Sequence, residues 1–162
     1  MTGKSCDCHR WDPRTDGACT DLGVAPRALD VLLPQSVEAP SLARSALRRW
    51  IAAFGCTEGF VEDAALIASE AVTNAVVHAR SAPRLFAEVD ERRLRIEVHD
   101  ASRDLPVLRP WKVAVGGQGL RIVAAVADAW GWSMTGTGKH LWTEQTLRCT
   151  WSPPMSTSRP TR

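Results

Sequence analysis

Apolar residues return every three or four positions in two neighbouring stretches of the chain. The first stretch predicts a helix from Ser41 to Phe54 with one buried face, and Gly55 supplies its end. The second stretch is more apolar and predicts a longer helix from Thr57 to Arg80, for which Thr57 is a suitable N-cap. These two helices are expected to form part of one layer of a folded domain.

After Pro83 the period of the hydrophobic pattern changes to two. In two successive runs apolar residues occupy every second position: Leu85, Ala87 and Val89, then Leu94, Ile96 and Val98. Such alternation predicts two strands with one face against a core, and Asp90 to Arg92 supply the turn of a hairpin. The second strand is expected to end at Asp100.

The rest of the chain completes the pattern with weaker signals. We expect a first strand over Arg27–Leu33 and a long loop over residues 101–118. A third helix is expected over Leu120–Trp130, followed by a second hairpin formed by Trp132–Met134 and His140–Arg148. The order β-α-α-β-β-α-β-β predicts an α+β fold, a two-layer sandwich in which a mixed, mostly antiparallel sheet carries helices on one face. Residues 1–25 and 150–162 are predicted to be flexible tails on one domain, residues 26–149.

Composition and charge place the chain among ordinary soluble globular proteins. It has 162 residues, of which 44% are hydrophobic and 23% charged, and its formal net charge is +2. That charge is too small to predict nucleic-acid or membrane binding, and no apolar run approaches the roughly 18 residues that span a bilayer. A cytoplasmic location is therefore expected. Five cysteines without a secretory signal favour free thiols over disulfides, and the spacing of Cys6, Cys8, His9 and Cys19 favours incidental thiols over a zinc site.

A line of polar residues interrupts the second predicted helix. Glu70, Asn74 and His78 are spaced by four residues, so they lie on one face of that helix, and Asn74 is the only asparagine in the chain. A half-buried polar line needs partners, and a carboxylate beside a carboxamide suits a bound cation together with an anion. The alternatives are an asparagine bonded to the core backbone, a surface glutamate and a structural histidine.

Two further motifs flank the predicted long loop. They are Asp100-Ala-Ser102-x-x-x-Pro106 at a strand end and Gly116-Gly117-Gln118-Gly119-Leu120 at a helix start. The acid could accept a hydrogen bond from the exocyclic amine of adenine, or it could only begin a turn. The glycines could let a backbone approach phosphate groups at a helix N-terminus, and they could also be the hinge of a closing loop. No Lys-Ser/Thr pair follows them, so they are not a P-loop.

In this order and with these intervals, the three motifs resemble the ATP-binding domain of the histidine-kinase-like ATPase superfamily, which has the Bergerat (GHKL) fold. The most similar branch is that of the small bacterial anti-sigma-factor serine/threonine kinases. Three strings carry this similarity: Ser69-Glu-Ala-Val-Thr-Asn-Ala-Val-Val-His-Ala79, Asp128-Ala-Trp-Gly-Trp132 and Gly138-Lys-His-Leu-Trp142. The resemblance covers residues 27 to 148, which is most of the chain.

The resemblance implies ATP and magnesium as cofactors. In it Glu70 is the catalytic base and Asn74 is the magnesium ligand. The remaining nucleotide-binding residues that it implies are Asp100 and Ser102 for the adenine, and Gly116, Gly117, Gly119 and Leu120 for the phosphates and the lid. It further implies a kinase that phosphorylates a serine or threonine of a small antagonist protein, a sigma-factor partner, a possible homodimer and no direct contact with nucleic acid. A non-catalytic switch, in which ATP orders the lid for a partner, and a nucleotide hydrolase are the alternatives.

One departure from the family pattern, at His140, and the tryptophans of the chain lead to two further predictions. His140 stands where the branch often has threonine near the adenine, so an altered or water-mediated adenine contact is expected. Trp50, Trp130 and Trp142 are expected to pack in the core, because large aromatic side chains contribute most of their stability when they are buried.

Overall fold

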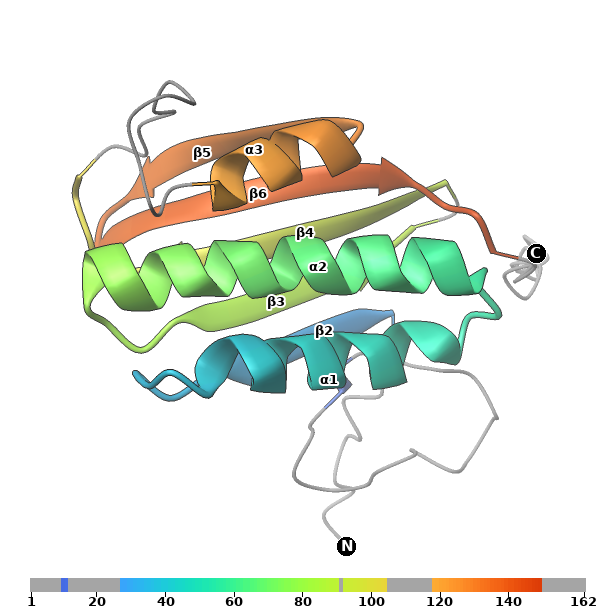
Figure 1. Cartoon of the computed structure of the whole chain (residues 1–162), viewed down its shortest axis with the longest axis horizontal. Coiled ribbons are helices and arrows are strands. Elements are labelled where there is room, and N and C mark those ends of the chain that lie inside the picture. The colour runs from blue at the N-terminus through green and yellow to red at the C-terminus, as the bar shows by residue number, and fades with distance from the viewer. Residues whose placement is uncertain (1–9, 12–26, 91, 105–117, 150–162) are drawn as a thin grey trace, which may run out of the picture.

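The computed structural model (Figure 1) describes residues 10–11, 27–90, 92–104 and 118–149. In chain order the elements are β1 (Arg10–Trp11), β2 (Ala28–Leu32), α1 (Ala39–Ala52), α2 (Glu58–Asn74), the π-helical turn η1 (Ala75–Ala79), β3 (Arg84–Val89), β4 (Arg93–Asp100), α3 (Gly119–Val126), β5 (Ala129–Thr135) and β6 (Gly138–Thr146). Among these described residues, no helix combines the length and the apolar character that crossing a bilayer requires.

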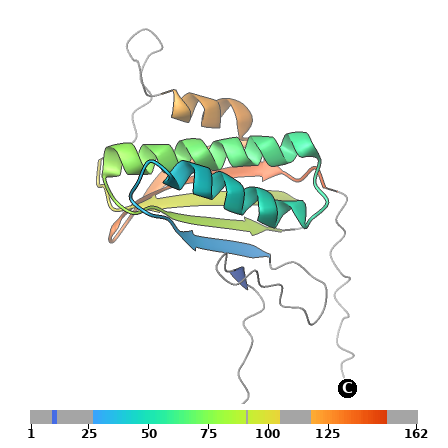
Figure 2. The same ribbon diagram turned by 60° about the horizontal axis from the view of Figure 1, so that its bottom comes forward.

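The strands form a single sheet in the order β1-β2-β3-β4-β6-β5, and only β1 and β2 are parallel. The three helices cover one face of this sheet (Figures 1 and 2). The predicted two-layer α+β sandwich is therefore confirmed. The predicted N-terminal tail is wrong at two residues, because Arg10 and Trp11 pair with Ala28 and Leu29. The remainder of both predicted tails lies outside the described residues.

The core lies between the helices and the inner face of the sheet. Alternate residues of β3 and β4 are buried in it, as their period of two predicted. Trp50 and Phe54 from the end of α1 are among its largest fully buried side chains, and their rings meet edge to face with centroids 5.2 Å apart. Trp130 packs against the edge of this core. The buried faces of α1 and α2 both belong to this core, which packs the two helices against the sheet.

Trp142 does not pack in the core, contrary to the prediction. It lies on the outer face of the sheet, which the helices leave uncovered, because side chains alternate along β6 and Leu141 and Thr143 point inward. Its ring covers Gly131 on β5, where an added Cβ would come within 2.7 Å of the indole. The guanidinium of Arg95 lies 5.0 Å from the ring centroid, a cation–π distance.

Two helix ends differ from the predicted boundaries. The helix expected over 57–80 is α-helical only to Asn74 and continues as the π-helical turn η1, after which Arg80 adopts a left-handed conformation with φ of 49°. The helix expected to reach Trp130 ends at Val126, and Ala127 is already extended. The pairing of β5 with β6 outweighs the helical preference of this alanine-rich segment, and the Asp128 carboxylate accepts the Thr146 N–H at 2.5 Å at the start of that pairing.

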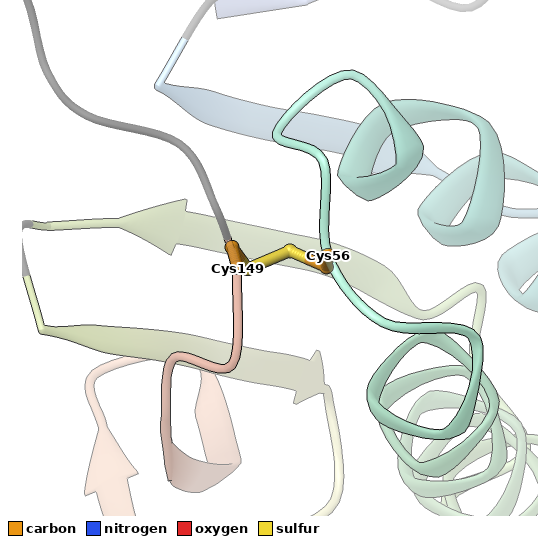
Figure 3. The surroundings of a disulfide bond; sticks show 2 residues. All are labelled: Cys56 and Cys149. Carbon is orange, nitrogen blue, oxygen red and sulfur yellow. A yellow bond between two sulfur atoms is a disulfide. The ribbon is translucent and has the colours of Figure 1, made fainter.

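A disulfide joins Cys56, between α1 and α2, to Cys149, which follows β6 (Figure 3). The prediction of free thiols is therefore wrong for these two cysteines. They are separated by 93 residues in the sequence, so neither the odd number of cysteines nor their spacing indicated that these two lie close together. The neighbouring backbone is also paired, since the Thr57 N–H donates to the Arg148 carbonyl at 3.1 Å. Cys6, Cys8, His9 and Cys19 lie outside the described residues.

Candidate functional site

Three elements meet toward one end of the molecule. In Figure 1 the C-terminal end of α2, the end of β4 and the start of α3 all lie toward the left. The helix α2 packs against both α3 and β4, so it is the common support for residues from all three elements. Glu70 and Asn74 lie on α2 one turn apart, and both are half-buried. His78, which continues their line, is exposed on η1.

Gly119 brings the glycine motif directly against the polar line. A Cβ on residue 119 would lie 2.7 Å from Glu70 Oε2 and 3.4 Å from Asn74 Nδ2. The first of these distances is below any normal contact, so any side chain at this first position of α3 would have to displace the Glu70 carboxylate. Two motifs that are distant in the sequence therefore share one small volume.

The close approach at Gly119 predicts an unusual response to alanine. In a helix interior alanine is more stable than glycine by about 0.5–1 kcal/mol, and Gly59→Ala, at the second position of α2, should show a gain up to this size because its Cβ would meet nothing within 4 Å. Gly119→Ala is expected to lose that gain entirely, because the new methyl group displaces the Glu70 carboxylate. Urea unfolding of both variants measures the difference. Equal stabilisation by the two substitutions would contradict the contact.

The Asn74 side chain has an unsatisfied group. Its Nδ2 atom is buried and has no hydrogen-bond partner among the residues that the structure describes. A buried amide of this kind usually finds a partner, which a bound ligand would supply. The amide oxygen of Asn74 and the carboxylate of Glu70 are hard oxygen donors, and magnesium needs few protein ligands because it keeps several waters. The residues present therefore fit a magnesium ion carried by a phosphate ligand.

Asp100 ends β4 in a nearly buried position. Its Oδ1 accepts the N–H of Ser102 at 2.8 Å and lies 3.3 Å from the ammonium of Lys139, a pair whose side chains are 8% and 11% exposed. Both contacts use the same carboxylate oxygen, and Oδ2 takes part in neither of them. The next residue, Ala101, donates its N–H to the Ser81 hydroxyl at 3.1 Å, which ties the end of β4 to the segment after η1.

The start of α3 offers backbone donors rather than side chains. The Leu120 side chain is buried in the core, so Leu120 could contact a nucleotide only through its N–H. Gln118 makes no side-chain cap, and the first bonded amides of the helix are those of Arg121 and Ile122. The N–H groups of Gly119 and Leu120 are therefore free donors of a helix N-terminus that lies beside Glu70 and Asn74, a favourable arrangement for an anion. Gly116 and Gly117 lie outside the described residues.

His140 lies on the outer face of the sheet, the face opposite to that of Asp100, and the altered adenine contact stays a prediction. It pairs with His99 across β4 and β6, and the two imidazole rings stack on the outer face with centroids 4.8 Å apart. The residue opposite Asp100 is Lys139, which the sequence reasoning missed. Only the strand register could have identified Lys139, because the Gly-Lys-His string does not say which side chain points inward.

The outer face beside His140 carries an ordered group of charges. The Glu97 carboxylate accepts Arg95 Nε at 2.8 Å and is hydrogen-bonded to His99 Nε2 at 3.0 Å. The pKa of Glu97 is lowered: burial acts to raise it, but the bonds from Arg95 and His99 outweigh burial. The pKa of His140 is lowered, chiefly by burial, and Glu97 only partly opposes this. The sequence reasoning missed Glu97 and His99, for which alternation along β4 was the available signal.

Comparison with known proteins identifies the family. The model of the histidine kinase-like ATPase domain matches residues 33–144. The chain therefore belongs to the histidine kinase-like ATPase family, and ATP binding is implied by that membership. No curated protein matches the chain.

A solved structure shares the fold. It is the crystal structure of the RsbU and RsbW domains of Rv1364c from Mycobacterium tuberculosis, with a TM-score of 0.60 and 21% sequence identity. The match covers 74% of this chain and 32% of that one, so the present chain spans about a third of the length of the protein it resembles.

Proposed function

We propose that this protein is a magnesium- and ATP-dependent regulatory protein that phosphorylates a serine or threonine of a small antagonist protein. One observation carries the proposal, namely that Gly119 at the start of α3 lies against both Glu70 and Asn74. A phosphate group at that helix start would meet backbone N–H groups, a carboxamide and a carboxylate together. The anti-sigma motifs in the sequence support a protein as the phosphate acceptor.

In this proposal each residue has a distinct task. Asn74 holds the magnesium ion, whose positive charge offsets the charge of the phosphates when the ion is bound. Asp100 accepts the exocyclic amine of adenine through Oδ2, while Ser102 and Lys139 hold its other oxygen in place. Gly119 and Leu120 donate backbone N–H groups to a phosphate. Glu70 accepts the proton of the attacking hydroxyl group, which requires only hydrogen-bond reach in the complex.

Removing either anchor is expected to weaken ATP binding. Asn74→Ala and Asp100→Ala should each raise the Kd for ATP, measured by calorimetric titration with magnesium, by about 10- to 100-fold, as expected for hydrogen bonds to charged groups. Glu88→Gln, on the exposed outer face of β3, is the matched control and should bind ATP like the parent. Unchanged affinity in Asn74→Ala and Asp100→Ala would show that the assigned pocket is wrong.

The partner can be identified by capture. The immobilised protein is incubated with a bacterial lysate in the presence of ATP or of ADP, and the captured proteins are identified by mass spectrometry. We expect a small protein whose capture depends on the nucleotide and which gains one phosphate on serine or threonine. Capture with ATP but without phosphorylation would instead support the non-catalytic switch. Light scattering of the purified protein tests the predicted homodimer.

A further inference from the structure

The outer face of the sheet brings together three side chains that the nucleotide site does not use. Glu97 and His99 lie two residues apart on β4, and His140 lies opposite His99 on β6. Each offers one oxygen or nitrogen atom, and these three atoms all lie within 4.8 Å of one another. We propose that Glu97, His99 and His140 form a binding site for a divalent transition-metal ion, with Zn²⁺ as the best fit.

The chemistry of the three groups selects the type of ion. Two imidazoles and one carboxylate are the ligands that zinc accepts, whereas magnesium and calcium prefer oxygen alone. Zinc sites with three protein ligands keep a fourth position for water or an exchangeable ligand. The present group has that composition. The longest of the three separations, at most 4.8 Å, would have to shorten by up to about 1.5 Å, because ligand atoms around a tetrahedral zinc lie roughly 3.3 Å apart.

The surroundings hold these side chains in position. Arg95 donates to Glu97 Oε1 at 2.8 Å and to Glu144 Oε1 at 2.9 Å, so the Glu97 carboxylate is fixed from behind. Its other oxygen, Oε2, is turned toward His99 Nε2 at 3.0 Å. Partners that orient a ligand in this way are usual around protein metal sites. The pairing of β4 with β6 fixes the distance between the two histidines.

One atom of this group lacks a partner without a metal. His140 Nδ1 is buried and has no hydrogen bond to any residue that the structure describes. Its ring stacks on that of His99 at an interplanar angle of 25°, so the two imidazoles lie next to each other on this face. A buried nitrogen of this kind is normally satisfied, and a metal ion bound in common by His140, His99 and Glu97 would satisfy it.

The test measures zinc binding by the full-length protein after removal of metals with a chelator. It is made in a Cys6→Ser, Cys8→Ser, Cys19→Ser background, so that thiols near the N-terminus cannot supply the binding. Equilibrium dialysis with Zn²⁺ and elemental analysis should give one bound ion per chain, and excess Mg²⁺ should not displace it. His99→Ala, Glu97→Gln and His140→Thr should each weaken binding by at least about tenfold.

Two control variants separate this site from the rest of the molecule. His78→Ala removes an exposed histidine on η1, and Asn74→Ala damages the proposed nucleotide site on the opposite side of the sheet; both should keep the zinc ion. A second measurement compares each protein with itself, with and without Zn²⁺, so a difference in stability between the variants does not affect it. Zn²⁺ should raise the unfolding temperature of the parent but not of His140→Thr. No binding by the parent at micromolar Zn²⁺, or equal binding by all the variants, would overturn the proposal.

Discussion

Replacing Glu70 with glutamine is expected to slow phosphoryl transfer by about 10²- to 10⁴-fold, the usual contribution of a positioned general base. Glutamine keeps the shape of the side chain beside Gly119 but cannot accept a proton from the attacking hydroxyl group. ATP affinity should change by less than about threefold, because hydrogen bonding to nearby groups is retained. Single-turnover transfer of labelled phosphate from ATP to the captured partner measures the rate.

Asp63→Asn is the matched control for this experiment. Asp63 lies seven residues before Glu70 on the same side of α2, but it is exposed, so its substitution should leave the rate unchanged. A second variant, Glu70→Ala, removes the possibility that glutamine acts through a water molecule. If both Glu70 variants transfer phosphate at the parent's rate, Glu70 is not the base. A loss of transfer that follows a loss of ATP binding would assign Glu70 to binding instead.

The hydrophobic pattern of the sequence predicted those elements in which one period runs through the whole element. Residues of α1, β3 and β4 follow one period throughout, so the bounds from the sequence differ from the observed ones by only a few residues. The end of α3 could not be found in this way. The alanines after Val123 suit a helix, and only the pairing of Ala129 with Glu144 on β6 makes this segment a strand. Tertiary context overrode local preference there.

In the candidate site, too, the sequence predicted features that depend on neighbouring residues but not contacts between distant segments. Motif order predicted that Glu70, Asn74 and Asp100 act together, since each sits at a helix face or a strand end. The contact of Gly119 with Glu70 depends on how α3 packs on α2, which no spacing in the sequence reveals. Lys139 was missed for a related reason. Adjacent strand residues point to opposite faces, and the register between β4 and β6 decides which one meets Asp100.

Loss of the disulfide is expected to be the most damaging single change to stability. The bond between Cys56 and Cys149 closes a separation of 93 residues, and removing a loop constraint of that length costs about 4.7 kcal/mol, within a usual range of 2–5. It also ties the exit of β6 to the entry of α2, the helix that carries Glu70 and Asn74 (Figure 3). Urea unfolding of a Cys56→Ser, Cys149→Ser variant against the parent measures the difference.

Reductant supplies the internal control for this prediction. The parent should lose stability when a reductant is added, the double variant should not respond, and a Cys6→Ser, Cys8→Ser, Cys19→Ser variant should respond like the parent. Because two of the five cysteines are paired, the unfolded but unreduced parent should show at most three reactive thiols. Five reactive thiols, or equal stability of parent and double variant without reductant, would mean that β6 and α2 are held together by packing alone.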